Sequence, residues 1–438
     1  MRAPSRFIAF CLIALVAGGG LLWWASTPPT LAPTSATIPV APAAAFLNAD
    51  ASAAYYETQI RRHPEDIDAY VALAQVYLQQ AAETGREADF VPRAEATIAS
   101  ALERTPSHYV ARVMQARLYN TLHQFEAARD LARTLLAENE KHAYVYGILV
   151  DALVELGEYD AAVIVCDQML ALKPSLAAYA RASYLRELHG DGEGAIEAMQ
   201  LAANAGVTGS HDRAWALYNL ANLYLGQNDA DTAAYLFQGI LDERPDFALA
   251  LGGLGHIAHL RGDVATATRH LQAAHAQQPR DEFLERLLEI RAEAGETQEA
   301  DHLVDALYDG YLAAAAMGEN VDMEIADFLA DQDQDLERAL DLAIQNYSRR
   351  PNHLHTLETY AWTLFKNNRP DEAIPYIERA QRFDTGDAMV DYRAGLIYRA
   401  AGNSSASRMA LERALANHLH IESPTSAAHA QALLRTTS

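Results

Sequence analysis

Residues 214–247, AWALYNLANLYLGQNDADTAAYLFQGILDERPDF, decide the fold together with the next 34 residues, 248–281, ALALGGLGHIAHLRGDVATATRHLQAAHAQQPRD. Each stretch holds two segments with apolar residues at helical spacing, separated by a polar turn. Each also contains a proline near its end, and Pro245 and Pro279 are 34 residues apart. Because proline stops a helix, one 34-residue period predicts one helical hairpin.

The same period recurs along most of the chain. Alanines that are 34 residues apart occur at 128 and 162, at 233 and 267, and at 339 and 373. Antiparallel helices approach closely only where the facing residues are small, so we expect Ala221 to face Ala233 across its hairpin. Asn228 and Asp229 supply the turn and a cap for the second helix.

The pattern Leu217-x-x-Leu220-Ala221-x-x-Tyr224, followed by Ala233, Phe237, Ile240 and Pro245, resembles a tetratricopeptide repeat. The resemblance implies an all-α, right-handed superhelix of about ten helical hairpins. It also implies that the first helix of each hairpin lines a concave groove that binds a protein or peptide. No single hairpin buries both of its faces, so neighbouring hairpins must stack.

The repeat pattern varies in strength and divides the chain. It is strong from 109 to 176, from 214 to 281 and from 339 to 416, and it weakens between 282 and 338, where Ala300 and Ala339 are 39 residues apart. The expected divisions are an N-terminal signal or transmembrane anchor (1–25), a Pro/Ala/Thr-rich linker (26–49), an N-terminal array (50–281), a degenerate region (282–338), a C-terminal array (339–420) and a capping segment (421–438).

The first fifty residues predict export. Arg2 and Arg6 precede an uncharged run, residues 7–25, which would reach about 28 Å as a helix and so barely span a bilayer. The arginines favour a cytoplasmic N-terminus, which places the body of the chain outside the cytoplasm, in the cell envelope. An uncleaved anchor is the preferred interpretation, and a cleaved signal peptide with secretion is the alternative.

Charge and cysteine content exclude several classes of partner. The chain has 34 Lys and Arg against 58 Asp and Glu, a formal charge of −24, so a nucleic-acid partner is not expected. Its two cysteines, Cys11 and Cys166, form no Cys-based metal site and no disulfide framework. No cofactor is predicted, and the oligomeric state cannot be read from the sequence.

The repeat phase predicts which side chains face the groove. The predicted peptide-binding residues are Tyr144, Trp215, Tyr218, Asn222, His256, Phe283, Arg286 and Trp362, and His355 and Glu358 fall on the same stripe. Aromatic anchors of this kind carry binding energy at interfaces. The alternative is that Trp215 and Trp362 pack against the adjacent repeat as ordinary core.

Catalytic motifs are missing from the sequence. No nucleophile elbow and no phosphate loop occurs. His256, His259 and His270 are candidates for a metal site, but no Glu or Asp falls within one turn of the His256/His259 pair. We therefore expect a non-enzymatic scaffold or adaptor of the bacterial cell envelope. The alternatives are a structural or self-associating envelope component and, less favoured, a metal-dependent hydrolase that uses these histidines.

Overall fold

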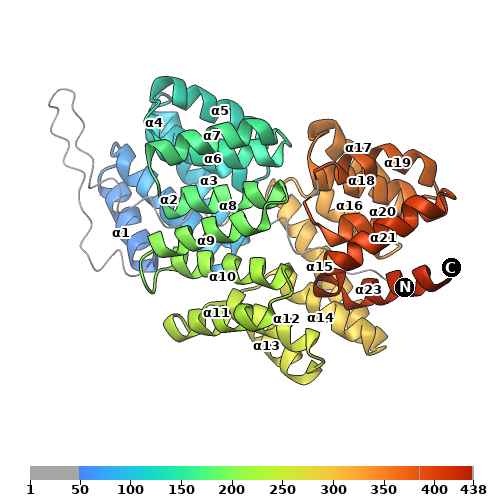
Figure 1. The fold of residues 1–438 in the computed structure, drawn as a ribbon. Coiled ribbons are helices and arrows are strands. Elements are labelled where there is room, and N and C mark those ends of the chain that lie inside the picture. Colours follow the sequence, from blue (N-terminus) through green and yellow to red (C-terminus); the bar gives the residue numbers. More distant parts are fainter. Residues whose placement is uncertain (1–48, 384, 437–438) are drawn as a thin grey trace.

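The structure, a computed structural model, describes residues 49–383 and 385–436 and is all-helical over these residues (Figure 1). Twenty of its helices form ten hairpins, as the sequence predicts. The first helices are α2 (Ile67–Thr84), α4 (Tyr109–Thr121), α6 (Ala143–Glu155), α8 (Leu176–Leu188), α10 (His211–Gly226), α12 (Ala248–Leu260), α14 (Asp281–Glu293), α16 (Asp322–Asp331), α18 (Leu354–Lys366) and α20 (Ala388–Ala400). The second helices are α3 (Glu87–Arg104), α5 (Phe125–Glu138), α7 (Tyr159–Leu172), α9 (Gly192–Ala205), α11 (Ala230–Glu243), α13 (Val264–Gln277), α15 (Thr297–Ala316), α17 (Leu336–Arg349), α19 (Pro370–Gln381) and α21 (Ser404–Ala416).

Small residues lie where the two helices of each hairpin meet. Ala221 and Ala233 are both fully buried in the hairpin of α10 and α11. In the last hairpin, Ser407 Oγ donates a hydrogen bond to the carbonyl of Gly395, 2.8 Å away, which brings α20 and α21 into direct contact. A Cβ on Gly395 would lie 2.6 Å from the side chain of Leu411, so a larger residue there would force Leu411 to shift. These contacts confirm the predicted role of the small residues.

The predicted turn residues cap the second helices. The Asp229 side chain accepts a hydrogen bond from the backbone N–H of Thr232, at 3.0 Å, and begins α11. Asp263 does the same for Thr266 at 3.1 Å and begins α13. Each cap satisfies a backbone donor that the first turn of a helix leaves without an intrahelical partner.

The region of weak repeat pattern forms two hairpins of unequal helices. α15 is 20 residues long, whereas α16 has only 10. The long helix accounts for the 39-residue spacing between Ala300 and Ala339, which exceeds the 34-residue period by five residues. Phe328 of α16 stacks on Tyr308 of α15, with ring centroids 6.0 Å apart, so this stretch has a core of its own.

The superhelix turns back on itself after about six hairpins. Ala82 accepts hydrogen bonds from Gln278 and Arg280, His123 contacts the carbonyl of Asn320, and Leu354 donates to Tyr159. The partners in these contacts are 195 to 198 residues apart, which is about 5.8 periods of 34 residues. In Figure 1 the orange and red C-terminal hairpins accordingly lie beside the green and yellow ones.

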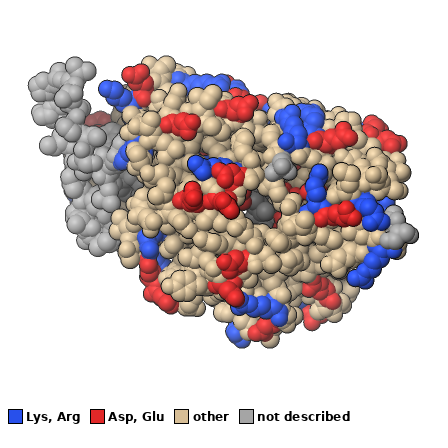
Figure 2. Space-filling view, in the orientation of Figure 1, with Lys and Arg blue, Asp and Glu red and all other residues tan. Residues whose placement is uncertain are grey.

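Three further helices lie at the ends of the array. α1 (Ala49–Arg62) packs on α2, and α22 (Leu419–Glu422) and α23 (Pro424–Thr436) follow the last hairpin. Except for residue 49, the predicted anchor (1–25) and linker (26–49) lie outside the described residues. Among the described residues, no helix combines the length and apolar character needed to cross a bilayer. On the face drawn in Figure 2, acidic and basic side chains are interspersed.

Candidate functional site

A cavity of about 580 Å³ lies on the concave side of the array. One wall is made by the first helices α8, α10, α12 and α14. The opposite wall is made by the start of α18, the loop 385–387 that precedes α20, and residues 416–422. Because the superhelix is tightly wound, the groove that the sequence predicts is enclosed here by hairpins from the next turn.

The segment around α22 is seated against the first wall. His256 Nε2 donates to the carbonyl of Ile421 at 2.9 Å, and Arg286 Nη1 donates to the carbonyl of Glu422 at 2.7 Å. The side chains of Leu419 and Ile421 are buried, at 0% and 7% exposure. This wall therefore binds the main-chain carbonyl groups of a peptide segment, and that segment, residues 421–422, belongs to the same chain.

Burial controls the ionisation of the polar groups around the cavity. Burial, aided by the positive charge of Arg286, holds the pKa of His256 well below its usual value, so the imidazole is neutral and donates one hydrogen bond. Burial and the nearby carboxylate of Asp387 raise the pKa of Glu187, on α8, to about 7. A carboxyl group that holds its proton near neutral pH can donate a hydrogen bond to a ligand.

Four of the eight predicted groove residues line the cavity. They are Trp215, Asn222, His256 and Arg286, and they come from the successive first helices α10, α12 and α14. Trp215 is only 3% exposed and so belongs to the wall rather than projecting into solvent. Whether these four side chains bind a ligand stays a prediction.

The structure does not bring the other four predicted residues into the cavity. Tyr144 lies on α6, and Tyr218 packs against Phe237 with ring centroids 5.7 Å apart. Phe283 fills the space above Gly252, where a Cβ would lie 2.2 Å from its ring. Phe283 reaches the adjacent first helix α12, and Tyr218 reaches Phe237 of its own hairpin, before either side chain reaches the central space.

Trp362 lies in the packed interior beside a buried arginine. Its Nε1 donates to Asp331 Oδ1 at 2.7 Å, and its ring lies 4.7 Å from the guanidinium carbon of Arg393. The indole is 3% exposed. Trp362 therefore packs against neighbouring repeats as ordinary core, which is the alternative interpretation given for it above.

The three histidines considered for a metal site do not converge. His256 is bonded to Ile421, whereas His259 Nε2 lies 2.8 Å from a carboxylate oxygen of Glu293. Among the described residues, His256, His259 and His270 are not part of any group of three potential ligands. The structure therefore gives no support to a metal site on these three histidines.

Sequence reasoning missed the groups on the opposite wall. Asp387 lines the cavity from a connection rather than from a first helix, beside His355 on α18. Glu187, on α8 of the first wall, also lines the cavity and was not predicted. The repeat phase placed His355 on the groove stripe, but it gave no signal that a loop residue from the next hairpin would lie close to it.

Comparison with known proteins gives one family match. The family model described as tetratricopeptide repeat matches residues 113–177 and 218–282. No curated protein matches the chain in a sequence search.

Three solved structures that match the chain do so at low sequence identity. The APC/C hetero-tetramer Cut9-Hcn1 is 15% identical, with 90% of this chain and 93% of that chain covered and a TM-score of 0.40. Yeast Tom70 is 13% identical, with 88% and 92% covered and a TM-score of 0.37. YrrB, described as a repeat protein with an unusual peptide-binding site, is 20% identical, with 45% and 95% covered and a TM-score of 0.28. The described part of this chain is therefore an all-α array of helical hairpins, in which residues 113–177 and 218–282 match the tetratricopeptide repeat model.

Proposed function

We propose that this chain is a non-enzymatic scaffold that binds a protein or peptide in its concave cavity, at the bacterial cell envelope. One observation carries the proposal: His256 and Arg286 already bind the main-chain carbonyls of Ile421 and Glu422. Donors that read carbonyl groups rather than side chains suit a peptide ligand of varied sequence. The cavity beside them, of about 580 Å³, has the size of a site for a few side chains.

The envelope location rests on the sequence of residues 1–25, with its two arginines before an uncharged apolar run. Fractionation of cells that produce the full chain tests it directly. We expect the chain in the membrane fraction and accessible to protease from outside the cytoplasm. Recovery of the intact chain from the cytoplasmic fraction would exclude both the anchor and the exported alternative.

Filling the cavity tests the binding site. Asn222→Trp adds an indole to the cavity wall, and Gln238→Trp, on the exposed face of the second helix of the same hairpin, is the matched control. Affinity capture from envelope extracts, quantified by mass spectrometry, should recover the same specific protein with wild type and Gln238→Trp. Recovery should fall with Asn222→Trp, and equal recovery with all three would reject the cavity as the binding site.

A second candidate function, self-association, is favoured by apolar side chains on the outer face. Ile164, Leu201 and Tyr235 lie on the successive second helices α7, α9 and α11 and are 60%, 49% and 78% exposed. Sedimentation at increasing concentration should show association that Tyr235→Lys weakens. A monomer at all concentrations would exclude this candidate.

A further inference from the structure

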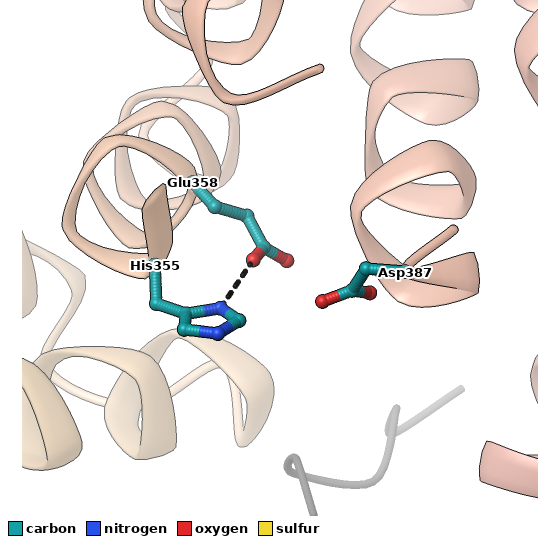
Figure 3. Close-up of side chains that lie close together, drawn as sticks. All are labelled: His355, Glu358 and Asp387. Carbon is teal, nitrogen blue, oxygen red and sulfur yellow. Dashed lines mark hydrogen bonds and ion pairs between the residues drawn. The ribbon is translucent and has the colours of Figure 1, made fainter. Parts of the chain in front are cut away.

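Three side chains with metal-binding atoms meet at the cavity wall that lies opposite α12. His355 and Glu358 lie one turn apart on α18, and Asp387 lies directly before α20. One ligating atom from each of the three lies within 4.8 Å of the other two. Figure 3 shows the imidazole and the two carboxylates turned toward one gap between the two helices.

The protein holds these groups in position from behind. Asp387 Oδ1 accepts hydrogen bonds from the backbone N–H groups of Met389 and Val390, at 3.0 and 2.9 Å, which orients its carboxylate as the cap of α20. His355 Nδ1 lies 3.4 Å from Glu358 Oε2. Glu358 is fully buried, whereas His355 and Asp387 line the cavity, so the group opens toward the cavity on one side.

The surroundings carry an excess of negative charge. Arg393 is the buried cation nearby, and it is engaged with Asp327 at 2.6 Å and with Asp331 at 2.9 Å. Its distance to Glu358 is 3.6 Å. Glu187, on the other side of the cavity, interacts electrostatically with Asp387. Burying several carboxylates beside one guanidinium is costly, and a further cation would offset that cost.

The geometry points to a binding site for one divalent transition-metal ion, with Zn²⁺ as the representative, formed by His355, Glu358 and Asp387. Ligands about 2.0 to 2.2 Å from a tetrahedral zinc ion lie about 3.3 to 3.6 Å from one another, so the side chains need to close by roughly 1.5 Å at most. An imidazole ligand favours zinc and its neighbours over calcium or magnesium, which prefer oxygen alone. Three protein ligands leave a fourth position, on the side of the cavity.

Titration calorimetry on the full chain, freed of any tag and treated with chelator, tests this site with zinc chloride. We expect one ion per chain for wild type. Asp387→Asn is the decisive variant, because asparagine caps a helix as well as aspartate and removes only the charge and the ligand oxygen. It should weaken zinc binding by at least about tenfold, since even outer partners of metal ligands commonly contribute that much.

Two further variants and one control complete the experiment. His355→Ala and Glu358→Gln should weaken zinc binding as Asp387→Asn does, whereas His302→Ala, an exposed histidine on α15, should not. Circular dichroism establishes that each variant is folded before titration. Wild-type affinity in Asp387→Asn and His355→Ala, or no stoichiometric zinc binding by wild type, overturns the site.

The choice of metal gives a second measurement. Cobalt(II) bound by the wild type should show the visible absorption of a metal site with a low coordination number. His355→Ala should lose this absorption. Calcium should not displace the cobalt. Displacement by calcium at a similar concentration would mean that the imidazole is not a ligand, and it would also overturn the site.

Discussion

Replacing Arg393 with methionine tests how much the buried ion cluster between α16 and α20 stabilises the C-terminal hairpins. Arg393 Nη1 and Nη2 lie 2.6 and 3.1 Å from the two carboxylate oxygens of Asp327, and Nη2 lies 2.9 Å from both oxygens of Asp331. The arginine side chain is fully buried. Methionine keeps most of the alkyl chain, so the main change is that two buried carboxylates lose the cation that offsets their charge.

The expected loss is large because the cluster is shielded from water. Removing one partner of a buried ion pair costs about 3 to 5 kcal/mol of unfolding free energy. With a urea dependence of about 2 kcal/mol per molar, the unfolding midpoint should fall by roughly 1.5 to 2.5 M. Urea titration followed by far-ultraviolet circular dichroism, with chelator present, measures it.

Two comparisons decide whether charge is the cause. Arg399→Met lies on the exposed side of α20 and should leave the midpoint within about 0.3 M of wild type, as surface changes usually do. Adding Asp331→Asn to Arg393→Met removes one uncompensated charge and should recover part of the loss. A midpoint for Arg393→Met equal to that of Arg399→Met would refute the reasoning, and so would a further loss in the double variant.

Three other outcomes follow from the contacts described. Gly157 has φ +72°, and a Cβ there would lie 2.4 Å from the backbone of Asn352 and His353, one superhelical turn later. Gly157→Ala should therefore lower the free energy of unfolding by roughly 2 kcal/mol or more, measured by thermal melting. Gly262→Ala, with φ +79° but nothing within 4 Å, should cost only the backbone strain. Glu187 has a pKa of about 7 in the folded chain, above its ordinary value, so the folded state holds the proton more tightly and stability should fall as pH rises toward and through 7. Glu187→Gln should flatten that fall in urea titrations at several pH values. His256→Ala removes the bond to Ile421, worth about 1 kcal/mol, and should speed amide hydrogen exchange in α22 and α23; unchanged exchange would show that the bond does not hold the segment.

The sequence predicts the hairpins because their determinants lie within one repeat. Ala221 and Ala233 are 12 residues apart, and Asp229 caps a helix that begins at the next residue, so a 34-residue window contains the reasons for each hairpin. The opposite wall of the cavity has no such local signal. His256 and Ile421 are 165 residues apart, and Arg393 and Asp327 are 66 apart.

The residues on that wall depend on the pitch of the superhelix. Pitch is the sum of small rotations between successive hairpins, and each rotation depends on how side chains such as Phe283 and Gly252 interlock. A change of a few degrees per hairpin would place different residues opposite α12. Periodicity therefore predicted the groove stripe, but it could not predict that Trp362 would be covered by neighbouring hairpins and that Tyr218 would pack on Phe237 of its own hairpin.

The contacts between residues 195 to 198 apart have a consequence for how the chain reaches its folded state. Most repeat arrays fold by nearest-neighbour growth, in which any stretch can form before the rest. Here a stretch such as α2 and α3 gains its last partners only after more than 170 further residues have emerged during synthesis. Such long-range closure slows folding, so we expect a late, slow phase in which preformed hairpins wind into their final coil.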